Sequence, residues 1–349
     1  MNRIKTRVIK VGNVLIGGDN PISVQSMTNT ITKDVKSTVK QIKELEKAGC
    51  NIIRSAINDF EDAKAISEIK KEISIPLIAD IQYDYKLALE SIKYGVDGLR
   101  LNPGNIGSPD RVREVVKACK DNGISIRVGV NAGSIKKEFL EKYNGVNEDS
   151  MVYSALEQIN ILEEMDFHDI KISLKASNVP LTVKAYEKMS KMVDYPLHLG
   201  ITEAGPIWRG SIKSSVGIGI LLSMGIGDTI RISLTGEPVE EVKVGREILK
   251  SLNLLQEGIE LISCPTCGRT NIDLINIVER AEKKLEGINK HIKVAIMGCP
   301  VNGPGEAREA DIGIAGGKGE GLIFMKGEII KKVKEEDLLD ELLREIEKL

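Results

Sequence analysis

Three cysteines and one glutamate near the end of this 349-residue sequence have the types and the spacing of metal ligands. Cys264 and Cys267 form a CPTC motif, in which two thiolates can reach one metal ion or cluster, and a second motif, CPVNGPGEA, begins at Cys299. A proline follows Cys264 and Cys299, as in many loops that hold iron–sulfur clusters. Glu306, seven residues after Cys299, is the oxygen donor available as a fourth ligand.

This donor set favours an iron–sulfur cluster over two alternatives. Structural zinc usually completes its tetrahedron with a second CxxC pair or a histidine, and His291 is the only histidine nearby. A redox-active dithiol is the remaining interpretation of the CPTC motif. A helix predicted over 270–285 would begin just after Cys267 and place its positive end near that thiol. Cys50 and Cys119 are interpreted instead as small buried hydrophobic residues.

A second set of chemically active residues follows an alternating pattern along predicted strands. In SIRVGVN the apolar side chains share one face, while Arg127 and Asn131 lie on the other, and DIKISLKAS repeats the pattern with Lys175 and Ser177. Because the apolar faces must pack against helices, the polar faces are expected to point to the interior. The residues predicted to line a substrate site are Arg54, Asp80, Arg100, Asn102, Arg127, Asn131, Lys175, Ser177, His198, Thr202, Arg231 and Ser233.

Five cations in that set have few acids to neutralise them. Burying one guanidinium without a partner costs several kcal/mol, so convergence of these cations predicts a polyanionic ligand. The planar arginine fork fits phosphate oxygens in a bidentate way, which favours a small diphosphate. The alternative is pairing at strand ends with Asp80, Glu203 or water. Glu203, after the seventh predicted strand, is the best placed proton donor or acceptor, or else the partner of an arginine.

The elements that must position these residues alternate regularly after a predicted N-terminal hairpin. The predicted strands cover 21–27, 51–57, 76–81, 98–103, 125–131, 169–177, 196–202 and 229–235. Eight strands alternating with helices predict a (β/α)8 TIM barrel, with an open doubly wound sheet as the alternative. The sequence has no GxGxxG motif after the first strand, which disfavours a dinucleotide-binding sheet.

The alternation ends after a predicted helix over 239–252, and the cysteine motifs follow. We therefore expect a TIM-barrel substrate-binding domain over 1–254 and a smaller, cluster-binding α+β domain over 255–349. A net charge of −2 and 3% aromatic residues argue against nucleic acid as a partner. The longest apolar run is too short to span a bilayer, and no signal peptide opens the sequence, so we expect no membrane partner and a cytoplasmic location.

Taken together, the motifs occur in the order of a known family. They are SVQSMTNT, IRSAI, LRLNPGNIG, RVGVNAGS, LKAS, HLGITEAG, DTIRISL, CPTCGR and CPVNGPGEA. The chain resembles the family of bacterial 4-hydroxy-3-methylbut-2-enyl diphosphate synthases in its two-domain form, which act in the methylerythritol phosphate route to isoprenoids. One departure is visible, because Gln82 stands where the family usually has a histidine. No acid or base role is therefore transferred to Gln82.

The resemblance implies a [4Fe-4S] cluster held by Cys264, Cys267, Cys299 and Glu306. It implies that the barrel binds 2-C-methyl-D-erythritol 2,4-cyclodiphosphate through Arg54, Arg100, Arg127, Asn131, Lys175, Ser177, His198 and Arg231. It further implies an oxidoreductase that takes two electrons from flavodoxin or ferredoxin. Members are homodimers in which the barrel of one subunit is closed by the cluster domain of the other.

These implications lead to one hypothesis for the reaction, a reductive ring opening with loss of water. The cations fix the diphosphate, Glu306 is a replaceable cluster ligand, and Glu203 assists proton delivery. The alternative is a non-redox TIM-barrel lyase or aldolase that acts on a phosphorylated substrate and carries a structural zinc domain. A binding module that senses a metabolite is a third class.

Overall fold

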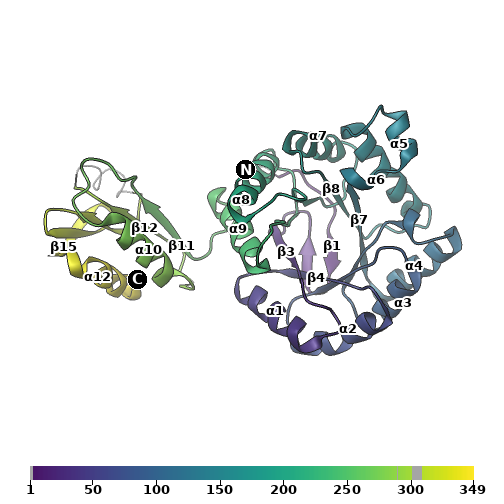
Figure 1. Cartoon of the computed structure of the whole chain (residues 1–349), viewed down its shortest axis with the longest axis horizontal. Helices are drawn as coiled ribbons and strands as arrows, with labels where there is room; N and C mark the ends of the chain where they lie inside the picture. Colours follow the sequence, from purple (N-terminus) through teal and green to yellow (C-terminus); the bar gives the residue numbers. More distant parts are fainter. Residues whose placement is uncertain (1–2, 289, 301–308) are drawn as a thin grey trace. The chain divides into compact units, whose positions relative to one another are not determined.

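The computed structural model describes residues 3–288, 290–300 and 309–349, and the chain divides into two compact units between Leu255 and Gln256. The first unit is a ring of helices around a ring of strands (Figure 1). Its strands are β3 (Ser23–Met27), β4 (Ile52–Ala56), β5 (Leu77–Asp80), β6 (Gly98–Arg100), β7 (Ser125–Asn131), β8 (Ile170–Lys175), β9 (His198–Leu199) and β10 (Thr229–Ile230). Each of the eight predicted strands is present.

These strands form one parallel sheet in the order β8-β7-β6-β5-β4-β3-β10-β9. A parallel bridge between Ile172 and Leu197 joins the two outer strands, so the sheet closes on itself. Closure confirms the predicted TIM barrel and excludes the open doubly wound sheet. The shortest strands, β9 and β10, lie side by side next to the point of closure.

The surrounding helices form where the sequence supplies an apolar face and a capping residue. They are α1 (Val35–Lys47), α2 (Phe60–Glu72), α3 (Tyr85–Lys93), α4 (Pro109–Asn122), α5 (Lys137–Lys142), α6 (Glu148–Glu163), α7 (Val179–Ser190), α8 (Ile207–Ser223) and α9 (Pro238–Ser251). Asp59 caps α2 by accepting a hydrogen bond from the Asp62 amide, and Asn147 forms a capping box with Ser150 on α6. Gly123 ends α4 with φ of 63°, a conformation that favours glycine.

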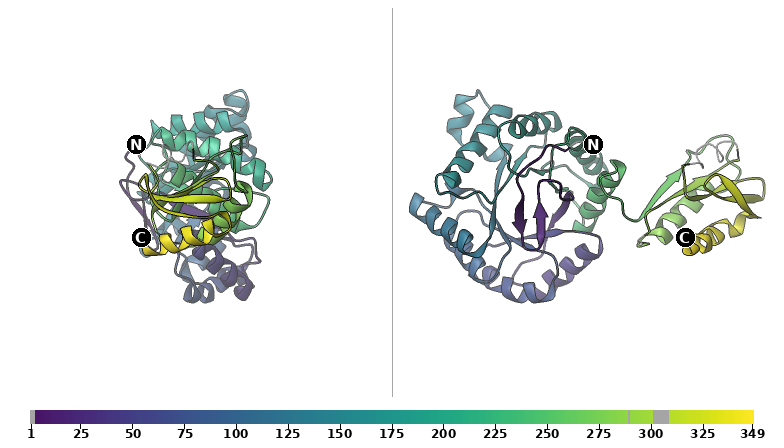
Figure 2. Two further views of the ribbon diagram at one scale, coloured as in Figure 1. Left: turned by 90° about the vertical axis from the view of Figure 1, so that its left-hand side faces the viewer. Right: turned by 180° about the vertical axis from the view of Figure 1, so that it is seen from behind.

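A hairpin closes one end of the barrel. Strands β1 (Ile9–Val11) and β2 (Val14–Ile16) pair antiparallel, as predicted, and lie across the ring (Figure 2, right, in purple). Val11 and Ile16 are fully buried and pack against Ile52 and Ile78 at the start of β4 and β5. The hairpin therefore replaces water with apolar contacts at the amino-terminal end, and leaves the carboxyl end of the strands for a site.

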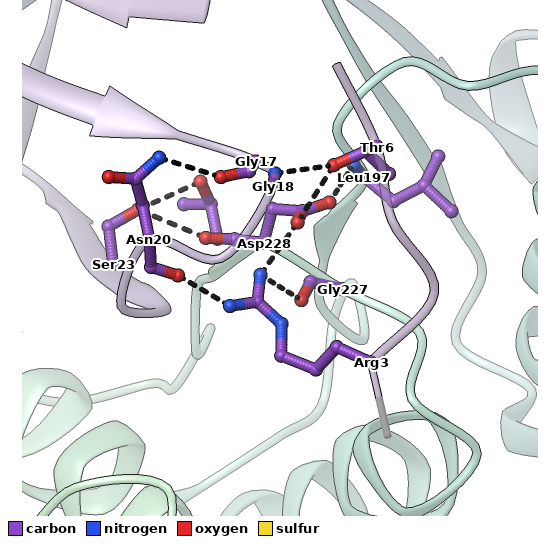
Figure 3. A network of polar contacts seen from close by, with 10 residues as sticks. Arg3, Thr6, Gly17, Gly18, Asn20, Ser23, Leu197, Gly227 and Asp228 are labelled. Carbon is purple, nitrogen blue, oxygen red and sulfur yellow. Dashed lines mark hydrogen bonds and ion pairs between the residues drawn. The ribbon is translucent and has the colours of Figure 1, made fainter. Parts of the chain in front are cut away.

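A buried carboxylate fastens the segment before this hairpin to the shortest strands (Figure 3). Asp228 Oδ1 accepts hydrogen bonds from Arg3 at 2.7 Å and from Thr6 at 3.1 Å, while Oδ2 accepts one from the Leu197 amide at 2.8 Å. Burial raises the pKa of Asp228, because removal from water disfavours the charged form. The Arg3–Asp228 ion pair and the hydrogen bond from the Leu197 amide together connect three segments that are far apart in sequence.

The second unit is a five-stranded mixed sheet with helices on one face. Strands β11 (Ile259–Ser263), β12 (Ile292–Met297) and β13 (Ile312–Gly316) run parallel, and β14 (Glu320–Met325) and β15 (Glu328–Lys334) continue antiparallel. Helices α10 (Leu274–Leu285) and α12 (Leu338–Lys348) bury Ala281 and Leu342 against the sheet. The unit has the predicted α+β architecture. In the part of the chain that the structure describes, we find no helix with the length and apolarity that a membrane span requires.

We expect Asp228→Ala to lower the free energy of unfolding by about 3 kcal/mol, because it leaves the partly buried Arg3 guanidinium without its carboxylate. Thermal and urea unfolding measure the loss. Asp19→Ala is the matched control, since Asp19 pairs with Lys5 in the same segment but is exposed, and we expect a change below about 0.5 kcal/mol. Equal losses in the two variants would contradict the assigned role of Asp228.

Candidate active site

Cationic side chains line the inside of the barrel because of strand register. Asp80, Arg100, Arg127 and Lys171 pair successively across β5, β6, β7 and β8. Residues that pair in register on neighbouring strands point to the same face of a sheet, so these four side chains share the barrel interior. Arg127 and Lys171 are almost completely buried. The parity predicted from the sequence is therefore the parity of the folded barrel.

One carboxylate serves two of the arginines. Asp80 Oδ2 lies 3.6 Å from Arg54 Nε, and Asp80 Oδ1 lies 3.4 Å from Arg100 Nη1. Burial and the neighbouring Arg231 lower the pKa of Arg54 to about 9, which still leaves the guanidinium charged at neutral pH. Arg100 Nη1 also donates to Gln82 Oε1 at 3.2 Å. Gln82 thus serves as a hydrogen-bond acceptor for Arg100.

The cations on the other side of the ring, Arg127 and Lys175, have no carboxylate at ion-pair distance among the described residues. Arg127 Nη1 donates to the Ser173 hydroxyl at 2.7 Å. Burial and the neighbouring Arg54 lower the pKa of Arg127, and burial together with Arg127 lowers that of Lys175 well below its usual value. Both shifts express the same physical fact, namely that positive charge is held away from water without an anion.

Buried polar atoms without partners mark the same region. In the described part of the chain, no hydrogen-bond acceptor is present for the Nε atoms of Arg54, Arg100, Arg127 and Arg231. Both ring nitrogens of His198 are likewise unpartnered, and its side chain is fully buried. Burial and Lys175 lower the pKa of His198, so the imidazole is neutral at neutral pH. An anion with several oxygen acceptors would satisfy these donors together.

Two glycines leave room for the cations. An added Cβ at Gly200 would lie 2.6 Å from Lys175 Nζ and 2.5 Å from the Arg231 carbonyl oxygen. An added Cβ at Gly129 would lie 3.0 Å from the Ser173 hydroxyl, the acceptor of Arg127. A side chain at Gly200 would therefore collide with the Lys175 ammonium and the backbone of Arg231, and one at Gly129 would crowd the Ser173 hydroxyl, so glycine is favoured at both positions by close approach rather than by backbone angle.

The remaining predicted residues divide into three groups. The side chain of Asn102 forms two hydrogen bonds with the backbone of Gly129. Asn102 Nδ2 donates to the Gly129 carbonyl oxygen, and Asn102 Oδ1 accepts from the Gly129 amide, both at 2.9 Å. Its side chain therefore positions β6 against β7. The half-exposed residues at strand ends are Asn131, Thr202, Arg231 and Ser233. Ser177 and Glu203 are exposed, and Glu203 has φ of 50°, which turns the chain sharply after β9.

Two interior residues were missed by the sequence analysis. Lys171 and Gln25 are each 1% exposed, and the Lys171 ammonium and both Gln25 amide atoms lack hydrogen-bond partners among the residues described. Lys171 has the same strand parity as Ser173 and Lys175, and Gln25 alternates with the buried Val24. Extending the alternation to the start of each strand is the signal that would have found them.

In the second unit, strand pairing brings the cysteine motifs together. Strands β11 and β12 are parallel neighbours, and Cys264 and Cys299 follow their carboxyl ends. The Gly298 amide donates to Cys264 Sγ at 3.2 Å, and the Asn271 amide donates to the Gly298 oxygen at 2.9 Å. The loop that carries the CPTC motif is therefore folded against the residue before Cys299.

The helix after this loop begins later than predicted. Helix α10 starts at Leu274, and Asp273 caps it by accepting from the Asn276 amide at 3.4 Å. The predicted start at Thr270 is wrong because residues 268–273 are not helical. The Cys267 amide donates a hydrogen bond to the Thr270 hydroxyl, and the Thr270 amide donates one to the Cys267 carbonyl oxygen. The carboxylate of the N-cap residue Asp273 already lies at the positive end of α10, so no effect of the helix dipole on Cys267 is inferred.

All five cysteines are free thiols. Cys50 and Cys119 are buried, as predicted, and burial raises the pKa of each thiol to about 12. Among residues 3–288, 290–300 and 309–349, the structure brings no three histidine, cysteine or acidic side chains into position around a metal ion. Glu306 lies outside these residues. Three free thiols on adjoining loops are still the donor chemistry of an iron–sulfur site, so the described residues fit such a group.

Comparison with known families agrees with both units. A model described as the GcpE TIM-barrel domain matches residues 6–246, and one described as the GcpE protein C-terminal domain matches residues 260–348. The chain belongs to the GcpE family. The 4-hydroxy-3-methylbut-2-en-1-yl diphosphate synthase (flavodoxin) of Clostridium acetobutylicum is 64% identical over 349 residues and is covered completely, as is this chain. The protein of the same name from Geobacter sulfurreducens is 59% identical over 99% of this chain and 98% of its own length.

Similarity to solved structures concerns the fold alone. The type I 3-dehydroquinate dehydratase of Clostridium difficile superposes with a TM-score of 0.53 at 16% identity, covering 71% of this chain and 98% of that one. The dihydropteroate synthase of Stenotrophomonas maltophilia gives a TM-score of 0.53 at 10% identity, with 71% and 97% covered. In this family, therefore, the interior side chains and not the barrel itself carry the information about chemistry.

We expect Gly200→Ala to weaken diphosphate binding, because its methyl group would push the Lys175 ammonium out of the ring. We also expect a loss of about 1–3 kcal/mol in stability from overpacking. The increase in melting temperature with added inorganic pyrophosphate measures the binding. Gly219→Ala is the control, since an added Cβ at Gly219 on α8 has nothing within 4 Å, and this variant should keep the full pyrophosphate effect. Undiminished binding by Gly200→Ala would show that Lys175 does not depend on the space at Gly200.

Proposed function

We propose that this chain catalyses the reductive ring opening of 2-C-methyl-D-erythritol 2,4-cyclodiphosphate to 4-hydroxy-3-methylbut-2-enyl diphosphate, with loss of water. The full-length relatives carry the name of this synthase. The observation that carries the proposal is the buried cationic ring, in which Asp80 is shared by Arg54 and Arg100 while Arg127 and Lys175 form no ion pair among the described residues. A cyclic diphosphate supplies the missing negative charge.

The chain's own residues bind and orient this substrate. Guanidinium forks from separate strands hold the two phosphates, and the ring fixes the scissile carbon–oxygen bond relative to the protein. The same cations stabilise negative charge as it develops on the leaving phosphate oxygen. They are already in place before the reaction, because Asp80 and Ser173 hold them in the free barrel. Asn131, Ser177, Thr202, His198 and Ser233 are proposed to contact the substrate from the ends and interior of the strands.

We further propose that Cys264, Cys267 and Cys299 hold a [4Fe-4S] cluster, with Glu306 as a replaceable fourth ligand. When bound, the cluster would supply the two electrons of the reduction, one at a time. Flavodoxin is the proposed electron donor, as in the printed names of the relatives, and ferredoxin is the alternative carrier. We prefer a redox reaction to the alternative, a lyase or aldolase that carries a structural zinc domain, because the relatives are named as the flavodoxin-dependent synthase.

A second copy of the chain is the proposed partner in a homodimer. The barrel holds the cations and the second unit holds the thiols, and we propose that the barrel of one subunit works with the cluster domain of its partner. Helix α8 supports self-association, because large apolar side chains recur on it every four residues and are 41–78% exposed. They are Trp208, Ile212, Val216, Ile220 and Met224. Sedimentation of a Trp208→Glu variant tests this, and an unchanged dimer would place the interface elsewhere.

We propose a cytoplasmic location for the reaction. The five free thiols suit a reducing compartment, in which disulfides do not persist. A cytoplasmic pool of low-potential electron carriers is also needed for the proposed chemistry. Fractionation of cells with an antibody against the chain tests the assignment, and recovery in an oxidising compartment would contradict it.

Iron content tests the cluster independently of activity. We expect the protein purified without air to be brown, with broad absorbance near 400 nm and about four irons per chain. Cys267→Ser should lose most of the iron, because it removes one proposed thiolate ligand. Cys119→Ala should keep the iron, because Cys119 is buried in the barrel core. A colourless protein with one zinc per chain would instead favour the structural-zinc alternative.

Turnover tests the role of Glu203. We expect Glu203→Gln to bind the cyclic diphosphate with nearly native affinity and to lower kcat by about 100-fold or more, because glutamine keeps the size but cannot donate a proton. An anaerobic assay with a chemical reductant and calorimetric binding separate the two effects. Glu237→Gln, a substitution at another exposed glutamate that precedes α9, should leave both unchanged. Strong loss of binding in Glu203→Gln would assign Glu203 a structural role instead.

A further inference from the structure

Lys171 is a buried cation to which the proposed reaction assigns nothing. It lies at the start of β8, four residues before Lys175 on the same face of the strand, so it is deeper in the barrel. Its side chain is 1% exposed, and its ammonium nitrogen has no hydrogen-bond partner in the described part of the chain. A lysine in such a place is unusual, because almost all buried lysines are paired.

The charged and titratable groups around Lys171 come from four other elements. Arg127 is its register neighbour on β7, Arg54 lies on β4, and His198 lies on β9. Asp228, before β10, is the acidic group of this set. Its carboxylate oxygens already accept hydrogen bonds from Arg3, Thr6 and the Leu197 amide (Figure 3). Lys171 is thus surrounded by more positive than negative charge.

We propose that Lys171 forms the floor of the anion site and takes up one proton from solvent when a diphosphate binds in the cationic ring. This inference rests on the proposed function, because it requires the ring to bind a diphosphate. Lys171 acts through the charge of the site rather than by contact with the reacting atoms, so it is a positioning residue. Binding and protonation are then linked, since the anion supplies the negative charge that this interior lacks.

The sign of the linkage follows from the charges. Burial, with the neighbouring Arg127 as the next cause, lowers the pKa of Lys171 to about 7 in the free barrel. The amine is therefore mostly protonated at pH 6 and mostly neutral at pH 8 before binding. A bound diphosphate raises this pKa, so the amine is protonated in the complex across this range. Lys171 then contributes more proton uptake at pH 8, where the amine is neutral before binding, than at pH 6, where it is already charged.

Calorimetry on the full-length, cluster-loaded protein without reductant tests this. The probe is the cyclic diphosphate, whose phosphate groups carry no proton that titrates near neutrality. Titration at one pH in buffers of different ionisation enthalpy gives the number of protons taken up. We expect the native protein to take up more protons than Lys171→Met, with a clearly larger difference at pH 8 than at pH 6. The difference reduces the contributions of Lys175 and His198, because both proteins contain them and the larger causes of the lowered pKa of His198, namely burial, Lys175 and Arg127, are the same in both.

Lys184→Met is the matched control, because Lys184 is exposed on α7, and it should show native proton uptake. Lys171→Met should also raise the melting temperature of the ligand-free protein, since methionine is unbranched like lysine, is one atom shorter and needs no partner. Lys171→Gln serves as a second variant that removes the titration. Equal proton uptake by the native protein and these Lys171 variants would overturn the inference. If the native protein does not bind the cyclic diphosphate, the proposed function fails first, and the inference fails with it.

Discussion

The structure depends on unneutralised positive charge that is held inside a closed barrel. Register across β5 to β8 forces Asp80, Arg100, Arg127 and Lys171 onto one interior surface, and only one of the four is acidic. Water would screen these cations in an open site, but most of them are buried. The free protein therefore stores electrostatic repulsion that a diphosphate relieves. Affinity for the anion and instability of the empty site have the same physical origin.

The surrounding scaffold offsets this repulsion. The N-terminal hairpin fills the amino-terminal end of the barrel with apolar contacts around Val11 and Ile16, away from the charged end. Asp228 connects the N-terminal segment to the shortest strands, where the backbone ladder is weakest. Apolar residues on the outer faces of the strands pack against the helices and form one large core. Stability is thus concentrated where the site is not, as is common in enzymes.

The two units divide the chemistry between them. The barrel has the charge to bind an anion, and the described part of the second unit has free thiols on adjoining loops, with Cys264 bonded to the Gly298 amide. Barrels of similar fold, such as a 3-dehydroquinate dehydratase and a dihydropteroate synthase, show that this architecture alone does not specify a reaction. Membership of the GcpE family and the interior cations together do so. The proposed role of Lys171 adds proton uptake to this site, because the charge of a bound diphosphate would favour the protonated amine.

Much of this protein follows from its sequence, because strand alternation and helix capping are local properties. They predicted eight strands, a closed barrel, an α+β second unit and an inward polar face that includes Arg127 and Lys175. Local pattern could not reveal that the side-chain amide of Asn102 forms hydrogen bonds with the backbone of Gly129, or that Gly200 leaves space for Lys175. Nor could it show that the Lys171 ammonium lacks a hydrogen-bond partner among the described residues. Each of these depends on how side chains of neighbouring strands meet inside the folded barrel, and only the tertiary structure decides that.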